Sequence, residues 1–340
     1  MPARRTFRHA VVGAIAVVLA SSCGGQGPAA LVGSHRIDDA EVVAAAAVLR
    51  SIFGVQSGTC GTLDGDTDTQ EAACNRLALS ALIPMKLADD YATANGVTVD
   101  AAAVTTAIED FEGQFGGDVL RVSLEENGAT RQQFETLIRG SLLQDEVAKA
   151  LTIEMLGEDG LLAAYERGLA DLTIVQVDHI LVGTEAEAND VYDRVTGPGA
   201  TRDDFLALAG KVSTDPTVQQ NEGSLGSSYA SGYTQAFADA VLAMQVGDIS
   251  RPVETEFGWH VINMVDKEVT PFDEAREGIV QAESGPIFFD WVRARVDEGD
   301  VEVDPRFGRY DREGLRVARI SSTDPSAVIT SPTPVNAAPG

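Results

Sequence analysis

Apolar positions recur every three to four residues through residues 31–170, which is the spacing of one face of an α-helix. Asp100 or Thr98 can cap one predicted helix, and Thr130 with Gln133 forms a capping-box pattern at the start of another. The apolar stripes of these helices comprise Val104, Ile108, Phe111, Phe115, Phe134, Leu137, Ile138, Leu142 and Val147. Such stripes need a partner surface. The pattern predicts a helical body whose stripes either close on one another or stay partly open.

The spacing of apolar residues changes from a helical to a strand-like pattern at Thr173. Val175, Val177, His179 and Leu181 alternate with the residues between them, so a strand places His179 on the same face as apolar neighbours. Helical patterns follow from Thr184 to the Gly-Pro-Gly turn at 197–199, over 201–211 and over 235–244, before strand-like alternation over 254–265. This order predicts a compact α+β domain over residues 173–267.

After Asp266 the pattern is helical again. Apolar residues available for packing in this part are Phe272, Ile279, Ile287, Trp291 and Val292. The last residues, 320–340, are rich in Ser, Thr, Pro and Ala, a composition that predicts a disordered tail.

The net charge of the chain disfavours some classes of binding partner. The 340 residues carry a formal net charge of −27, with hydrophobic residues at 44%. A chain of this length and composition can bury a large core. Its negative charge repels nucleic acid and anionic lipid head groups, so we expect no nucleic-acid partner. A dispersed acidic surface is typical of a protein that must stay soluble.

The first 22 residues predict an export signal. Arg4, Arg5 and Arg8 precede an apolar run over residues 10–20 that is too short to span a bilayer. The Arg-Arg-Thr-Phe start also resembles a twin-arginine signal. We therefore expect residues 1–22 to be removed and the mature protein to lie on the extracytoplasmic side of a bacterial membrane.

Cys23 follows small residues in a pattern that resembles the processing site of bacterial lipoproteins, where the Cys is acylated. Leu19 lies four positions before it, whereas the usual spacing is three, so ordinary cleavage after Ser22 is the alternative. The resemblance implies a lipidated linker over residues 23–30 and a membrane anchor. Lipidation would use one of the three cysteines and leave Cys60 and Cys74 to form a disulfide. In the chain-entropy model this closure stabilises the fold by about 3 kcal/mol.

An acidic loop lies between these two cysteines. Asp64, Asp66 and Asp68 alternate like the first ligands of an EF-hand. However, Thr69 stands at the sixth position and Asn75 at the twelfth, where that motif has Gly and Glu. We interpret the stretch as a solvated loop.

Several motifs in one order identify a family resemblance. They are VDHILV, STDPTVQQNEGSLG, TQAFADAVLAM and RPVETEFGWHVINMVD, which together span residues 177–266. This order resembles a parvulin-type peptidyl-prolyl isomerase domain, while LVGSHRIDDAEV resembles the start of the chaperone domain in SurA-like and PrsA-like foldases. VEVDPRFGRYD resembles the closing segment of related actinobacterial lipoproteins.

The resemblance implies an α+β fold in which the parvulin-like domain, a small antiparallel sheet with surrounding helices, is inserted in a mostly α-helical chaperone domain. Residues 31–170 would form the first part of that chaperone domain, and residues 270–310 would complete it with a C-terminal helix and a closing segment.

The resemblance also assigns the candidate site. It implies that the catalytic residues, in the polar floor of the family's site, are His179, Asp215 and His260. The substrate-binding positions it implies are Leu225, Tyr233, Phe237 and Thr255. Turning an X-Pro bond means crossing a barrier of about 18–20 kcal/mol, without any covalent step. An apolar slot for the proline ring and a polar surround for the moving carbonyl would lower it. No cofactor is expected, and no metal, since no third His or Cys is placed to join the His pair.

Other interpretations of these residues stay open. A His in a strand can be an ordinary core residue, and Asp215 in Ser-Thr-Asp-Pro can form an Asx-Pro turn. Tyr233 stands where the family has Met or Leu, and Glu222 replaces a Gly of its turn, so activity can be low. The loop after His179 lacks Arg and Lys, which disfavours phosphorylated clients.

The leading hypothesis is an extracytoplasmic foldase, a peptidyl-prolyl cis-trans isomerase that acts on newly exported polypeptides with X-Pro bonds. One alternative is a holdase chaperone whose parvulin domain is weak or inactive. Another is an envelope scaffold lipoprotein with one dedicated partner. The sequence leaves the clients and the oligomeric state open.

Overall fold

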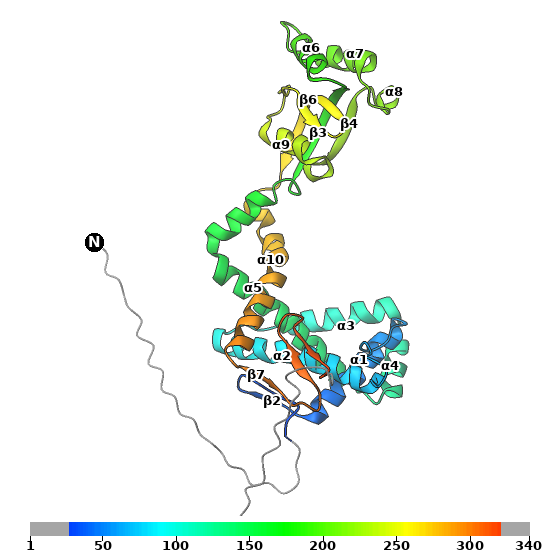
Figure 1. Ribbon diagram of the computed structural model, residues 1–340, viewed down its shortest axis with the longest axis vertical. Helices are drawn as coiled ribbons and strands as arrows, with labels where there is room; N and C mark the ends of the chain where they lie inside the picture. Colours follow the sequence, from blue (N-terminus) through cyan, green and yellow to red (C-terminus); the bar gives the residue numbers. More distant parts are fainter. Residues whose placement is uncertain (1–26, 321–340) are drawn as a thin grey trace, which may run out of the picture.

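A computed structural model describes residues 27–320 of the chain. The molecule is elongated, with a helical body at one end and a small α+β domain at the other (Figure 1). The predicted signal peptide, the lipidation of Cys23, the first half of the linker and the tail from residue 321 onward fall outside the described residues. Between residues 27 and 320, no helix is both long and apolar enough to cross a bilayer.

The body begins with a run of helices: α1 (Asp39–Val55), α2 (Gln70–Asn95), α3 (Ala101–Phe115), α4 (Gly117–Glu126) and α5 (Arg131–Arg167). Asp100 caps α3 by accepting a hydrogen bond from the backbone N–H of Ala102. Thr130 and Gln133 form the predicted capping box of α5. Gly157 interrupts α5 with a non-helical backbone, so this long helix is kinked there.

Most of the predicted apolar stripes close on one another. Val104, Ile108 and Phe134 are buried in one cluster with residues of α1 and α4, and Phe111 packs against it. Val147 belongs to a second, larger cluster built around α2. These two clusters form the core of the body.

The chain returns to the body after the small domain. α10 (Phe272–Asp297) packs along α5. β1 (Ala30–Val32), β2 (His35–Ile37) and β7 (Val301–Val303) then form one antiparallel sheet in the order β2-β1-β7. The hairpin of β8 (Arg309–Asp311) and β9 (Arg316–Ala318) covers α2, where the N–H of Val317 donates to Ser80 Oγ at 2.8 Å.

A disulfide joins Cys60 to Cys74. The acidic loop between them is only partly solvated. Asp64 and Asp66 are exposed, but the carboxylate of Asp68 is buried and forms an ion pair with Arg76. This ion pair and the N–H of Asp64, which donates to Asp68 Oδ2 at 2.8 Å, fold the loop onto α2.

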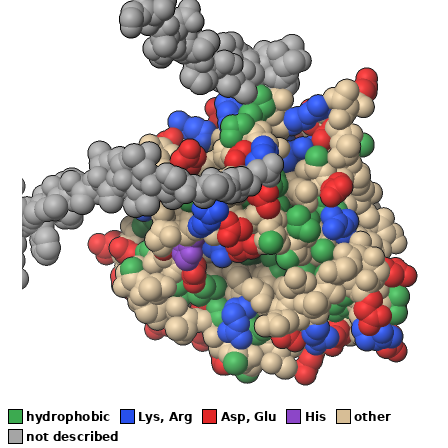
Figure 2. Space-filling view, turned by 90° about the horizontal axis from the view of Figure 1, so that it is seen from below, with side chains coloured by type: hydrophobic (Ala, Val, Ile, Leu, Met, Phe, Trp, Pro, Cys, Tyr) green, Lys and Arg blue, Asp and Glu red, His purple; other side chains and the backbone are tan. Residues whose placement is uncertain are grey.

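Charged side chains of both signs are mixed over the end of the body that lies away from the small domain (Figure 2). On the part of this face left uncovered by undescribed residues, no single sign of charge dominates.

The small domain is built on a four-stranded antiparallel sheet in the order β4-β3-β6-β5. Its strands are β3 (Thr173–Val182), β4 (Ser224–Tyr229), β5 (Val253–Thr255) and β6 (Gly258–Val269). Its helices are α6 (Glu185–Val195), α7 (Arg202–Val212), α8 (Val218–Asn221), the 3-10 turn η1 (Ala230–Gly232) and α9 (Gln235–Ala243). One apolar cluster joins α6 and α7 to the sheet, and another joins α9 to it.

The last predicted strand is in fact a hairpin. Thr255 pairs with Gly258, so the chain reverses between β5 and β6. Gly258 has φ +128°, a conformation that L side chains rarely adopt. The alternation of residue types continues through this turn, which is why the pattern alone predicts one strand.

Candidate active site

Two histidines lie side by side at the centre of the sheet. His179 comes from β3 and His260 from β6, and because Leu181 pairs with His260 the two imidazoles are diagonal neighbours. Their rings are stacked with centroids 5.3 Å apart, and their Nδ1 atoms are 3.1 Å apart. Both side chains are buried.

The hydrogen bonds around this pair run in one direction. His179 Nε2 lies 2.7 Å from Asp215 Oδ2, and His260 Nε2 lies 2.8 Å from Thr255 Oγ1. Because a carboxylate only accepts, His179 donates from Nε2 and accepts at Nδ1 from His260. The Thr255 hydroxyl then donates to His260. Both rings are neutral in this arrangement, and all four ring nitrogens are used.

Burial keeps both rings neutral. It lowers the pKa of His179, although the hydrogen bond to Asp215 acts in the opposite direction. Burial and the nearby His179 ring lower the pKa of His260 to about 4. For Asp215, burial opposes ionisation, but hydrogen bonds from Thr217 and His179 outweigh it and lower the pKa. At neutral pH the site therefore holds two neutral imidazoles and one carboxylate.

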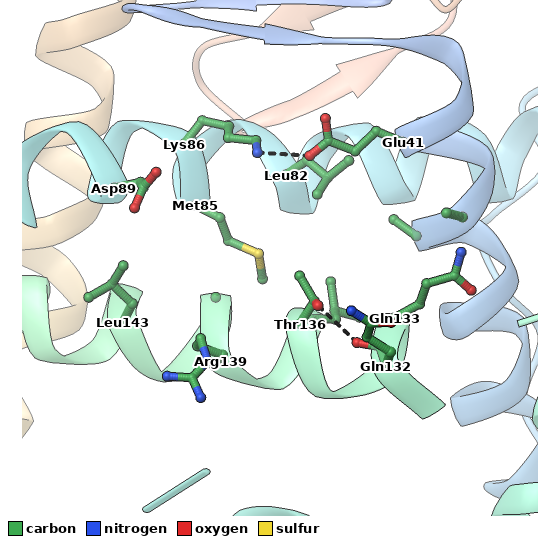
Figure 3. A pocket seen from close by; sticks show the side chains of 14 residues that line it. Glu41, Leu82, Met85, Lys86, Asp89, Gln132, Gln133, Thr136, Arg139 and Leu143 are labelled. Atoms are coloured by element: carbon green, nitrogen blue, oxygen red, sulfur yellow. Dashed lines mark hydrogen bonds and ion pairs between the residues drawn. The ribbon is translucent and has the colours of Figure 1, made fainter. Parts of the chain in front are cut away.

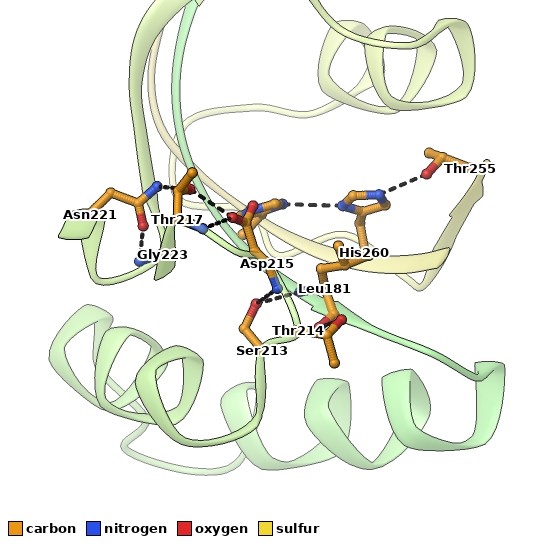
Figure 4. A network of polar contacts seen from close by, with 10 residues as sticks. Leu181, Ser213, Thr214, Asp215, Thr217, Asn221, Gly223, Thr255 and His260 are labelled. Atoms are coloured by element: carbon orange, nitrogen blue, oxygen red, sulfur yellow. Dashed lines mark hydrogen bonds and ion pairs between the residues drawn. The ribbon is translucent and has the colours of Figure 1, made fainter. Parts of the chain in front are cut away.

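Thr217 and Asn221 extend this network to the turn before β4 (Figure 4). Asp215 Oδ1 accepts from the backbone N–H of Thr217 at 2.7 Å and from its hydroxyl at 2.6 Å. The Asn221 side chain donates to Thr217 Oγ1 and accepts from the N–H of Gly223, each at 2.9 Å. Asp215 thus forms an Asx turn with one oxygen and holds His179 with the other, so the two interpretations of this residue are compatible.

Sequence reasoning missed Thr217 and Asn221. The only available signal was the Asp-Pro-Thr spacing, which is typical of an Asx turn and indicates no link to a histidine. The link depends on the path of the loop after α7, where Thr214 N–H donates to the carbonyl of Leu181 at 2.7 Å.

An aromatic wall stands over the histidines. The Phe237 ring on α9 meets His179 and His260 edge-on, at centroid distances of 6.3 and 5.3 Å. Tyr233 stacks on Phe237 at 4.6 Å, and Leu225 packs against the same cluster from a bulge in β4. The structure thus brings the seven sequence-predicted residues of the candidate site into one region.

Tyr233 and Glu222 have unusual environments. Tyr233 covers Phe237, which is only 3% exposed, and the Tyr233 hydroxyl is buried with no hydrogen-bond partner among the described residues. Burial raises the pKa of this phenol. Glu222 has φ +54°, the left-handed conformation that a glycine adopts without strain.

Residues 179–266 match the family described as PPIC-type PPIASE domain, and residues 3–148 match the SurA-like N-terminal domain. The chain carries a PPIC-type PPIase domain. The family resemblance and the fold class inferred from the sequence are thereby confirmed.

Relatives of this PPIase-containing chain include foldases named PrsA. The chain is 26% identical over 197 residues to foldase protein PrsA of Clostridium tetani. This match covers 54% of the chain and 57% of the relative. The chain is 31% identical over 167 residues to foldase protein PrsA of Clostridium botulinum, with coverages of 46% and 48%. The chain thus matches about half the length of these curated relatives.

Among solved structures, peptidylprolyl isomerase PrsA from Bacillus cereus is similar, at 22% identity and a TM-score of 0.43. The match covers 73% of this chain and 95% of that one. Within residues 27–320, no group of three or more His, Cys, Asp or Glu side chains is arranged to hold a metal ion.

Proposed function

We propose that the protein is an extracytoplasmic foldase whose PPIase domain catalyses cis-trans isomerisation of X-Pro bonds in exported polypeptides. The domain would span residues 173–267 as an insert in a helical chaperone body formed by residues 31–170 and 270–310. The continuous hydrogen-bond network from Asp215 through both histidines to Thr255, beneath an aromatic wall, carries the proposal. The PrsA foldases that the chain resembles support it.

The geometry favours catalysis by binding the twisted amide. Both nitrogens of each histidine are occupied, so neither ring has a free site for proton transfer to a client. Asp215 is likewise engaged by Thr217 and His179, which makes it a positioning residue. The apolar wall of Phe237, Tyr233 and Leu225 would grip the proline ring over this rigid floor. Rotation then needs only tighter binding of the twisted amide than of either planar form.

The direct test is proline-limited refolding of a client with catalytic amounts of the full chain. We expect acceleration by the wild type. Phe237→Leu should lose most of it, because this variant keeps apolar bulk but removes the ring. Phe237→Ala is less suitable, since deleting a buried ring costs about 3–5 kcal/mol of stability.

Phe289→Ala is a matched control, because this ring is 45% exposed on α10, in the helical body. It should retain the wild-type rate. Equal refolding with and without the wild-type chain would refute the proposed isomerase.

A cavity in the helical body favours a second candidate, a holdase. It has a volume of about 420 Å³ and lies between α1, α2 and α5 (Figure 3). Its apolar lining includes Ala44, Leu82, Met85, Leu137 and Leu143. The stacking of Tyr233 on Phe237 favours the same alternative if the Tyr233 ring takes the place of a proline ring on Phe237.

Gly140 offers a way to test the cavity. A Cβ at this position would lie 3.1 Å from Met85 Sδ, closer than an ordinary contact, so a larger side chain would displace the Met85 thioether and take up room in the cavity that both residues line. Gly140→Leu should also stabilise α5 by about 0.8 kcal/mol through helix propensity. Under the holdase hypothesis, this variant loses suppression of aggregation of a proline-free client while remaining folded.

Gly113→Leu is the control for that experiment. Gly113 lies in α3 with no atom within 4 Å of an added Cβ, so the variant gains similar helix propensity without filling a cavity. Equal suppression by the Gly140 and Gly113 variants would exclude the cavity as the client site.

The proposed membrane anchor is acylation of Cys23. We expect a labelled fatty acid to be incorporated by the wild-type chain in bacterial cells and to be lost in Cys23→Ala. Ordinary cleavage after Ser22 predicts no label in either. Cross-linking in the same cells addresses the scaffold alternative, for which one dominant adduct is expected in place of many clients.

A further inference from the structure

Phe257 is an aromatic ring held in solvent on the turn between β5 and β6. It is 67% exposed, more than any other large apolar side chain in residues 27–320. Isolated exposed apolar residues are common and by themselves indicate little. Phe257 differs because its turn lies against β3 at one end and is hydrogen-bonded to the candidate site at the other.

The turn has little freedom to move. Pairing of Thr255 with Gly258 leaves Glu256 and Phe257 as a two-residue loop. A Cβ on Gly258 would lie 2.6 Å from the carbonyl oxygen of Val182, so this end of the turn lies directly against β3. The backbone that carries the ring is therefore fixed relative to the sheet. Binding a ligand would then cost little free energy for ordering this turn.

Two hydrogen bonds connect Phe257 to the histidines. Its backbone N–H donates to Thr255 Oγ1 at 3.2 Å, and the Thr255 hydroxyl donates to His260 Nε2 at 2.8 Å. Thr255 lies at the end of the network opposite Asp215 (Figure 4). The turn with Phe257 therefore adjoins the floor at its Thr255 end.

The geometry points to Phe257 as a second client subsite, which takes an apolar side chain next to the proline. This inference rests on the proposed isomerase function and names a determinant of its client specificity. An exposed ring gains from contact with apolar or aromatic side chains. Glu254 and Glu256 are exposed on the same hairpin and disfavour an acidic client residue.

The experiment compares kcat/KM of the full chain for proline peptides that differ at one residue. One set places Leu, Gly, Glu or Lys before the proline, and a second set places them after it. In at least one set, Leu should exceed Gly by about three- to tenfold, the size expected for partial burial of a Leu side chain, and Glu should be slowest.

Variants assign the preference to the ring. Phe257→Ser should bring the Leu-to-Gly ratio close to one, and Phe257→Leu should retain most of it. Val246→Ser is the matched control, because Val246 is 58% exposed in the same domain. The N–H of the neighbouring Gly247 donates a hydrogen bond to the carbonyl of Met264. Met264 lies four residues from His260 in β6, so Val246 is attached to a different part of this strand. This control should keep the wild-type ratio.

Three results would overturn the subsite: a wild-type ratio near one in both sets, a ratio unchanged by Phe257→Ser, or a preference for Lys over Leu. Absence of turnover for every peptide would instead contradict the proposed isomerase function. In that case, calorimetric titration of the Leu and Gly peptides into the wild type and Phe257→Ser still decides the subsite through the ratio of affinities.

Discussion

Tyr233 carries a buried hydroxyl that lacks a partner among residues 27–320. An unsatisfied buried polar group costs about 1–3 kcal/mol. We predict that Tyr233→Phe raises the free energy of unfolding by about 1 kcal/mol, because it keeps the stack on Phe237 and removes only the hydroxyl. Urea unfolding of the full chain measures this. Lower stability of the variant would mean that the hydroxyl has a bound water as partner.

Glu222 is a second residue whose local conformation conflicts with its type. A non-glycine residue in the left-handed region destabilises the fold by about 1–2 kcal/mol. Glycine removes this strain, but it loses more conformational entropy on folding, which offsets part of the gain. We predict that Glu222→Gly stabilises the PPIase domain by about 0.5–1 kcal/mol in urea unfolding. Glu222→Ala, which keeps the Cβ, should leave stability nearly unchanged. Equal effects of both substitutions would argue against backbone strain.

At the residue scale, the sequence was most informative where a motif fixes spacing. The order of His179, Asp215, Phe237 and His260 predicted residues that the structure brings together. It could not predict that Asn221 supports Asp215 through Thr217, since that contact depends on the path of a loop.

At the scale of elements, the pairing of β3 with β6 buries two neutral histidines, and this makes stability depend on pH. The folded pKa of His260 is about 4, below the unfolded value of about 6.5. As the pH falls below 6.5, the unfolded chain takes up a proton that the folded chain excludes, so stability decreases. From this ring alone we predict a loss of about 3 kcal/mol between pH 7 and pH 4.

Hydrogen exchange of the backbone amides in β3 and β6, corrected for intrinsic rates, measures this loss locally. The lowered pKa of His179 acts in the same direction over the same pH range. His260→Asn should flatten the pH dependence. A profile that stays flat in the wild type would show that these rings are protonated in the folded state.

Helices were predicted well where their ends carry a chemical signal. Asp100 caps α3, and Thr130 with Gln133 forms the capping box at the start of α5, as the sequence predicted. Strands were predicted less well, because alternation of residue types is the same on both sides of a tight turn. The reversal before Gly258 is set by backbone conformation and by contact with β3, which residue pattern does not encode.

At the scale of the whole molecule, segments far apart in the chain form one body. β1 pairs with β7, and the Arg306 guanidinium binds the carboxylate of Asp39 across 267 positions. Periodicity indicates each helix but not its neighbours, so only the family resemblance suggested this closure. The hairpin of β8 and β9 was not predicted at all, since its three-residue strands are too short to show alternation.

This arrangement predicts that the middle of the chain is easier to remove than its end. The N–H of Thr270 donates to the carbonyl of Leu172 at 2.8 Å, so the two connections to the PPIase domain lie side by side. Replacing residues 173–269 by a short Gly-Ser linker should therefore leave the body folded, with a cooperative thermal transition by circular dichroism.

Truncation after residue 300 removes far fewer ordered residues but should prevent cooperative folding of the body. It deletes β7, which pairs with β1, and Val317, which is 4% exposed against the core around α2. Residue Val303 and the ring of Phe307 are lost from the same core. A truncated chain that melts like the wild type would show that β1 and α2 are stable without this cover, and the body would then consist of residues 31–170 and α10 alone.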